Sequence, residues 1–226
     1  MMCYNWRMKR GWVLLLGVLV LAGAVFPVTP DEAAANLEKA LRNIRSLQAR
    51  FEQLYYSMTV REPLRERGEL FLQKPDLMRW QYQDPQEKVF LYSGGVLQMY
   101  LPEEKQLTRS RIPPEAYDSD ILGIFLAAKS LRDLYIIEDT RFPTDSARVR
   151  QIKLTPKEEG DYSYALLEID DKTWLLHRAI FLEWAGNKRE FLFSQIRTNV
   201  TLPARTFELK VPADCEIIDE TGTSKR

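Results

Sequence analysis

The chain has 226 residues, of which 45% are hydrophobic, and its 32 Lys and Arg residues balance its 32 Asp and Glu residues. This balance gives no reason to expect nucleic-acid binding, and it argues against a strong electrostatic hold on anionic membranes. The length is sufficient for one domain with a full hydrophobic core.

The N-terminus has the layout of a secretory signal. Three basic residues precede an uncharged run over 11–26, and Ala22-Gly23-Ala24 offers the small residues after which a signal peptidase cuts. The alternative is a permanent membrane anchor, but a spanning helix needs about 20 apolar residues and this run is shorter. We therefore predict a cleaved signal peptide over 1–24.

Cleavage also decides what the cysteines can do. It leaves 29 Lys and Arg against 32 Asp and Glu, a net charge of −3, and it leaves Cys215 as the lone cysteine. An intramolecular disulfide is then impossible, because Cys3 lies in the signal. No cysteine follows the apolar run, so we do not expect the mature chain to be lipidated there as a bacterial lipoprotein.

The mature chain opens with a predicted helix. Thr29 suits the N-cap, Pro30 the first helical position, and Glu32 the third position of a capping box. Apolar residues then recur at helical spacing on one face: Leu37, Leu41, Ile44, Leu47 and Phe51. We expect this helix to end near Arg50 and to pack its apolar stripe on a sheet.

After the helix the pattern changes to short runs rich in aromatic and branched residues, which are typical of strands. The first six predicted strands are Phe51–Val60, Leu64–Gln73, Leu77–Tyr82, Lys88–Ser93, Val96–Leu101 and Gln106–Ser110. Gly94-Gly95 is a two-residue hairpin signal between two of them. Links as short as these predict an antiparallel meander.

An apolar segment interrupts the strands. Residues 121–128 are apolar nearly all round, and apolar residues continue at helical spacing to Tyr135. We predict two short helices, at about 119–129 and 130–136, the first too apolar to lie on the surface. Five further strands are expected: Val149–Thr155, Tyr162–Ile169, Trp174–Trp184, Lys188–Thr198 and Thr206–Lys210. The last ten residues are polar, and we expect them to be frayed.

These elements predict a mainly β (α+β) fold in one domain, with one strongly curved antiparallel sheet of about ten or eleven strands. A sheet of this size tends to curl into an incomplete barrel rather than lie flat. The N-terminal helix and the short helical segment, which would form a lid, are expected to pack on its concave face.

Residues that carry chemistry are scarce. His177 is the only histidine, it lies inside a predicted strand, and the chain has no Gly-x-Ser-x-Gly motif. Neither a phosphate-binding loop nor a set of zinc ligands is present in the sequence. We therefore predict that the chain is not an enzyme and needs no cofactor or metal.

The predicted strands carry more aromatic residues and methionine than one buried face requires. Methionine and aromatic side chains line adaptable apolar sites, because they can reshape around a ligand. Plain core packing explains many of them equally well. The residues alone therefore leave two interpretations open, a simple core and a cavity for lipid or peptide.

A resemblance favours the cavity. It is carried by Phe51-Glu52-Gln53, by the blocks Gly68–Tyr82 and Val89–Gly95, and by the ending Phe207–Pro212. On these residues the chain resembles the LolA family of periplasmic lipoprotein carriers. The resemblance implies an incomplete antiparallel barrel with a helical lid, in the periplasm of a Gram-negative bacterium. The block Phe207–Pro212 looks like the last strand of the family.

The resemblance also implies a site, because the family holds the acyl chains of a lipoprotein in a hydrophobic cavity. The expected cavity residues are Leu70, Leu72, Leu77, Met78, Trp80 and Tyr82, and the expected lid residues are Ile121, Leu122, Ile124, Phe125 and Leu126. Lys74 stands where the family usually has an arginine before proline, which ties the lid shut through hydrogen bonds to lid carbonyls. Lysine lacks the rigid fork of arginine, so a weaker latch and a different role both stay open.

The implied function is transport without chemistry. We expect a monomer that receives lipoproteins from an inner-membrane ABC-type lipoprotein-releasing complex and hands them to an outer-membrane acceptor. The alternative is an RseB-like periplasmic sensor or regulatory domain that binds lipid or polypeptide. Such regulators usually add a second domain, and this chain ends soon after Pro212, which favours the carrier. We expect one carrier domain over 25–219 and a polar tail over 220–226.

Overall fold

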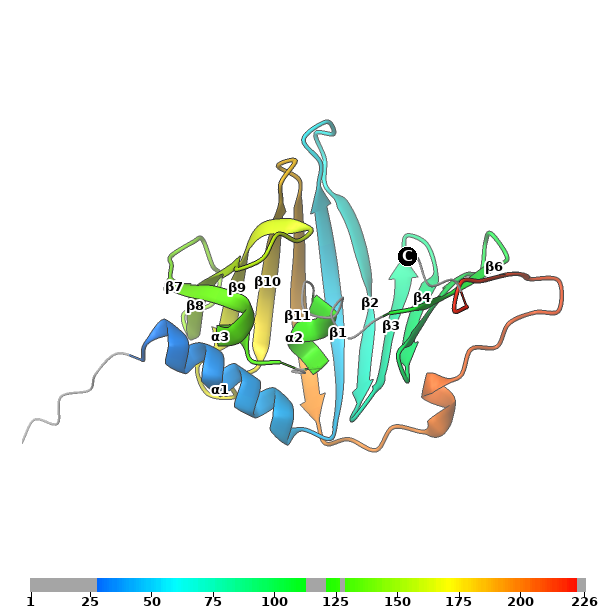
Figure 1. The fold of residues 1–226 in the computed structure, drawn as a ribbon, viewed down its shortest axis with the longest axis horizontal. Helices are drawn as coiled ribbons and strands as arrows, with labels where there is room; N and C mark the ends of the chain where they lie inside the picture. Colours follow the sequence, from blue (N-terminus) through cyan, green and yellow to red (C-terminus); the bar gives the residue numbers. More distant parts are fainter. Residues whose placement is uncertain (1–27, 113–120, 127–128, 223–226) are drawn as a thin grey trace, which may run out of the picture.

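The computed structural model describes residues 28–112, 121–126 and 129–222 (Figure 1). The predicted signal peptide over 1–24 lies outside the described residues. Among the helices that are described, none combines the length and the apolar character needed to cross a membrane.

Twelve strands form a single sheet. They are β1 (Ser46–Tyr56), β2 (Leu64–Gln73), β3 (Leu77–Asp84), β4 (Lys88–Ser93), β5 (Val96–Leu101), β6 (Gln106–Arg111), β7 (Tyr135–Asp139), β8 (Val149–Pro156), β9 (Tyr162–Asp170), β10 (Leu176–Glu183), β11 (Lys188–Thr198) and β12 (Glu216–Asp219). Their order across the sheet is β12-β6-β5-β4-β3-β2-β1-β11-β10-β9-β8-β7. The predicted open, curved sheet is confirmed, with twelve strands instead of ten or eleven (Figure 1).

Two antiparallel meanders build this sheet. One runs from β1 to β6 and the other from β7 to β11, and the long pair of β1 with β11 joins them in the centre. The edge strand β12 is an exception to the predicted antiparallel pattern, because it lies parallel to β6, with Glu216 beside Gln106. Segments far apart in the chain therefore meet at the centre and at one edge.

The first helix begins as predicted and ends early. Helix α1 (Pro30–Asn43) has a complete capping box, in which the Thr29 hydroxyl accepts from the Glu32 N–H and the Glu32 carboxylate accepts from the Thr29 N–H. The expected end near Arg50 is wrong, because β1 starts at Ser46. Leu47 and Phe51 are four residues apart, a spacing that fits a helical period and a strand period equally well. In the structure both belong to β1 and both are buried.

The interrupting segment is helical over shorter stretches than predicted. Helix α2 covers Ile121–Leu126 and helix α3 covers Leu131–Leu134. Tyr135–Asp139, which the prediction assigned in part to the second helix, forms the edge strand β7 against β8. The branched pair Ile136-Ile137 suits a strand, and the short apolar run does not show its period clearly enough to separate the two states.

The C-terminal part departs most from the prediction. The expected strand Thr206–Lys210 is instead a 3-10 turn, η2 (Ala204–Phe207), followed by an extended segment. The last ten residues are not frayed throughout, since 217–219 belong to β12. The C-terminal segment leaves the centre of the sheet at the end of β11 and returns to the edge beside β6 (Figure 1).

The hydrophobic core lies between the sheet and the helices. The three helices share one face of the sheet, which we call the inner face, as predicted for the concave face (Figure 1). One cluster of buried residues joins Leu37 and Leu41 of α1, Phe125 of α2 and Leu131 of α3 to inward residues of the strands. On the outer face, the C-terminal segment passes over β3 and bonds to Arg79.

Candidate functional site

Strand β3 sorts its residues between the two faces by strict alternation. Met78, Trp80 and Tyr82 are buried on the inner face, with 0%, 7% and 7% of their surfaces exposed. Leu77 falls on the other face with Arg79, because successive strand residues point to opposite sides. The structure therefore does not bring Leu77 to the predicted cavity, and that assignment is wrong.

The neighbouring strand β2 completes this wall. Leu70 pairs with Trp80 and Leu72 pairs with Met78 across the antiparallel ladder. Both leucines are fully buried in the same cluster. Five of the six predicted cavity residues are thus brought together on one apolar surface.

Trp80 stands at the centre of an aromatic cluster that spans four elements. Its ring lies 4.8 Å from Phe51 of β1, 5.6 Å and 6.0 Å from Phe191 and Phe193 of β11, and 6.2 Å from Phe125 of α2. Each pair is edge-to-face, the arrangement that aromatic rings favour. We call this cluster and the wall of β2 and β3 the chamber.

The sequence prediction of the site missed the far wall of the chamber. Phe191 and Phe193 face inward from β11, although the expected cavity was placed on β2 and β3 alone. The sequence signal for this face is weak, because Leu192 between Phe191 and Phe193 breaks the alternation with Glu190 and Ser194. Phe191 and Phe193 reach the chamber because β11 pairs with β1. This pairing joins distant parts of the chain.

Helix α2 covers the chamber. Ile124 and Phe125 are 4% and 3% exposed, and the Phe125 ring lies 5.1 Å from that of Phe193. The other predicted lid residues, Ile121, Leu122 and Leu126, are partly buried and pack against the same cluster. All five therefore pack against the chamber, and in this structure they and Trp80 fill it.

Lys74 joins the sheet to this cover by direct hydrogen bonds. Its ammonium, at the turn between β2 and β3, donates to the carbonyl oxygens of Phe125 at 3.1 Å and Leu126 at 2.6 Å. These are carbonyls at the C-terminal end of α2, which have no partner within the helix. Burial of the ammonium, and secondarily the nearby Arg42 guanidinium, lowers the pKa of Lys74 to about 8.

A second contact fixes α3 to α1. The carboxylate of Glu38, only 7% exposed, accepts hydrogen bonds from the Leu131 N–H at 2.7 Å and the Ser130 hydroxyl at 3.1 Å. Arg42, one turn further along α1, donates to the same carboxylate at 3.0 Å. The two ends of the covering segment are therefore attached differently, α2 by Lys74 and apolar contacts, and α3 by a buried carboxylate.

The chamber is an apolar surface. Among residues 28–112, 121–126 and 129–222, no group of three or more His, Cys, Asp and Glu side chains could hold a metal ion. The chamber is lined by aliphatic and aromatic side chains, with one internal hydrogen bond from the Trp80 indole to the Met78 sulfur at 3.1 Å. Such a surface recognises apolar chains.

The fold and this site define a class of β-sheet proteins in which short helices cover an apolar chamber on a curved, open sheet. Residues 42–210 match the family described as outer membrane lipoprotein carrier protein LolA. The chain belongs to this family.

Curated relatives agree with this assignment, and solved structures share the fold. An outer-membrane lipoprotein carrier protein of Methylococcus capsulatus is 29% identical over 188 residues, which cover 82% of this chain and 87% of that protein. An uncharacterized conserved protein from Thermus thermophilus has a TM-score of 0.56 at 12% identity, over 84% of this chain and 98% of its own. MucB has a TM-score of 0.50 at 16% identity, over 84% of this chain and 65% of its own. At these identities the two structures show a shared fold alone.

Proposed function

We propose that this protein is a periplasmic carrier that binds the acyl chains of lipoproteins released from the inner membrane and delivers them to the outer membrane. Membership of a family of outer membrane lipoprotein carrier proteins supports this function. A carrier works by differential burial and needs no reaction. This fits the prediction that the chain is not an enzyme.

The observation that carries the proposal is the apolar chamber with its attached cover. Ile124 and Phe125 are buried over the chamber, and Lys74 bonds to the end of the same helix. Contacts of this kind can be exchanged for contacts with an apolar ligand while the sheet beneath keeps its hydrogen bonds. The cover is therefore a lid, and cargo enters when it is displaced.

The free energy that holds the lid closed is similar in size to the free energy of burying part of an acyl chain. Burying two large apolar side chains such as Ile124 and Phe125 stabilises the closed lid by about 3–6 kcal/mol. An acyl chain gains about 0.8 kcal/mol for each methylene removed from water. Roughly four to eight methylenes are then enough to replace the lid contacts, and longer chains add net affinity. We assign acyl-chain contacts to Met78 and Trp80 on one wall and to Phe191 and Phe193 on the other.

Export and partners complete the proposal. A signal peptide over 1–24 would deliver a carrier domain over 25–219 to the periplasm. An inner-membrane ABC-type lipoprotein-releasing complex would load it, and an outer-membrane acceptor would unload it. The relatives described as outer-membrane lipoprotein carrier proteins support the carrier role, and the two partners are part of the proposal.

The test is a release assay. Inner-membrane vesicles that contain the releasing complex and a labelled lipoprotein are incubated with the mature protein and ATP, and the label in the soluble fraction is measured. We expect the wild type to carry the label into solution in a complex of one lipoprotein per carrier. Trp80→Ala should lose this activity, whereas Trp184→Ala, at a side chain that is 67% exposed, should keep it. Label that stays in the membrane with the wild type would refute the carrier function.

A further inference from the structure

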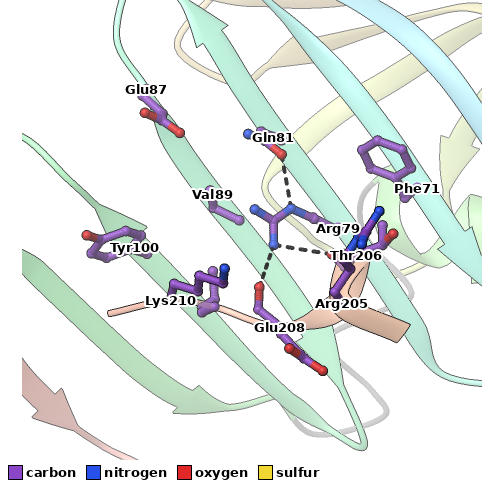
Figure 2. Close-up of a pocket in the computed structure, with 11 residues that line it drawn as sticks. Phe71, Arg79, Gln81, Glu87, Val89, Tyr100, Arg205, Thr206, Glu208 and Lys210 are labelled. Atoms are coloured by element: carbon purple, nitrogen blue, oxygen red, sulfur yellow. Dashed lines mark hydrogen bonds between the residues drawn. The ribbon is translucent and has the colours of Figure 1, made fainter. Parts of the chain in front are cut away.

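The outer face of β3 forms the floor of a second pocket, on the side of the sheet opposite the chamber (Figure 2). Its volume is about 460 Å³, and it lies between the sheet and the C-terminal segment. Its floor and walls include Phe71, Arg79, Val89, Tyr100, Arg205 and Lys210. This volume lies within the range of small-molecule sites.

Arg79 at the floor of this pocket has an unusual set of partners. Its guanidinium donates to the Gln81 side-chain oxygen at 3.2 Å and to the carbonyls of Thr206 at 3.3 Å and Glu208 at 3.1 Å (Figure 2). All three acceptors are neutral, and within the described part of the chain Arg79 forms no ion pair. Burial lowers the pKa of Arg79, and Glu87 offsets this only in part. A partly buried guanidinium whose hydrogen-bond acceptors are all neutral attracts an anion.

Two more cations border the same pocket. Arg205 and Lys210 come from the C-terminal segment, and neither forms an ion pair with any described residue. Glu87 and Glu208 also line the pocket, so its lining holds three cations and two acids and one positive charge is left over. The carboxylate of Glu208 points away from the Arg79 guanidinium, to which only its backbone carbonyl bonds (Figure 2).

The rest of the lining is apolar. Phe71, Val89 and Tyr100 project from neighbouring strands β2, β4 and β5 on the outer face, and Leu209 lies in the segment above them. We propose that this pocket binds an anionic amphiphile, with its phosphate or carboxylate group between Arg79 and Lys210 and its apolar part against Phe71 and Tyr100. Such a ligand would hold the C-terminal segment against β3, because it contacts both.

The probe for this site is dihexanoylphosphatidylglycerol below its micelle concentration, added to the mature protein and followed by calorimetry. Dihexanoylphosphatidylcholine has the same chains without the net charge, and inorganic phosphate has the charge without the chains. We expect the anionic lipid to bind more tightly than either of these. Equal affinity of the two lipids would overturn the proposal, and so would equal affinity of inorganic phosphate and the anionic lipid.

Two lysine variants locate the site. Lys210→Gln removes one cation without touching the bonds of Arg79 to the C-terminal segment, and we expect it to raise the dissociation constant of the anionic lipid roughly ten-fold. Lys172→Gln makes the same change at an exposed turn between β9 and β10 and should leave the affinity unchanged. Equal effects of the two variants would overturn the location.

A spectroscopic readout separates this pocket from the chamber. In ¹H–¹⁵N spectra, the anionic lipid should first shift the amides of Tyr100 and Lys210, while the indole signal of Trp80 stays in place. A shift of the Trp80 indole at the same lipid concentration would mean that the lipid enters the chamber, and it would overturn the assignment. This outcome would leave the carrier function untouched, since the release assay depends on the chamber alone.

Discussion

Replacing Lys74 should change the free energy that separates the closed lid from the open lid. Lys74→Met removes the ammonium, keeps most of the side-chain length, and leaves the carbonyls of Phe125 and Leu126 without their donor. In the closed form, Ile124 and Phe125 of helix α2 keep their apolar contacts with the chamber. We therefore expect the lid equilibrium to change while the domain stays folded.

The magnitude follows from two opposing contributions. Each of the two hydrogen bonds from the charged Lys74 side chain stabilises the closed lid by about 1.5–3 kcal/mol. Desolvation opposes this, since burial of the ammonium lowers the pKa of Lys74 to about 8. The net contribution should be about 1–2 kcal/mol, or roughly a 5- to 30-fold shift toward the open lid. Phe125→Ala should open the lid further, because burial of that ring alone contributes about 1.5–3 kcal/mol.

The assay uses Trp80 as the reporter. In the mature protein the other tryptophans are Trp174 and Trp184, and replacing both by Phe leaves Trp80 alone in the chamber. Lys74→Met should raise acrylamide quenching of Trp80 while the melting temperature changes little. Lys172→Met, at an exposed lysine far along the chain, is the matched control. If Lys74→Met and the control are quenched to the same extent, Lys74 does not hold the lid.

Three further predictions concern pH, α3 and the backbone of β2. The pKa of Lys74 is lowered from 10.5 to about 8 when the lid is closed, so the open form binds more protons than the closed form between pH 8 and 10.5. Raising the pH through this range should therefore favour the closed lid. Closure does not cost the hydrogen bonds, because the neutral amine of Lys74 still has donors for both carbonyls. Trp80 quenching should accordingly fall from pH 7 to 9.5 in the wild type and stay constant in Lys74→Met. Glu38→Gln should lower the free energy of unfolding in urea by about 1–3 kcal/mol, because an amide cannot accept all three hydrogen bonds of the buried carboxylate; exposed Glu104→Gln should not. In Gly68→Ala the new Cβ would overlap the Gln81 carbonyl. The free energy of unfolding should therefore fall by at least about 1–3 kcal/mol, which a lower melting temperature would show. Gly222→Ala is the control, because Gly222 has open space around it and this variant should melt like the wild type.

The sequence predicted those parts of the structure that depend on local patterns. The capping box at Thr29 and Glu32 uses contacts within one turn, and it forms as expected. These contacts lie within a short stretch whose geometry the chain itself sets. For Lys74 the resemblance indicated the position but left the role of a lysine there open, and its bonds to the carbonyls of Phe125 and Leu126 join segments far apart in the chain.

The parts that were missed depend on contacts between distant segments. Leu47 and Phe51 fit helix and strand alike, and only the pairing of β1 with β2 and β11 decides between them. The same β1–β11 pair brings Phe193 opposite Phe51 and so creates the far wall of the chamber. The parallel strand β12 needs a return of the chain to β6, for which the sequence has no local signal.

The central claim, that acyl chains occupy the chamber, can be tested by photo-crosslinking. A lipoprotein whose fatty acids carry a diazirine is loaded on the mature protein, irradiated, and the labelled residues are found by mass spectrometry. We expect labels on inner-face residues such as Met78, Trp80, Phe125 and Phe193, and we expect Trp80→Ala to weaken loading. Labels confined to outer-face residues such as Phe71 or Tyr100, with none on the inner face, would contradict the central claim.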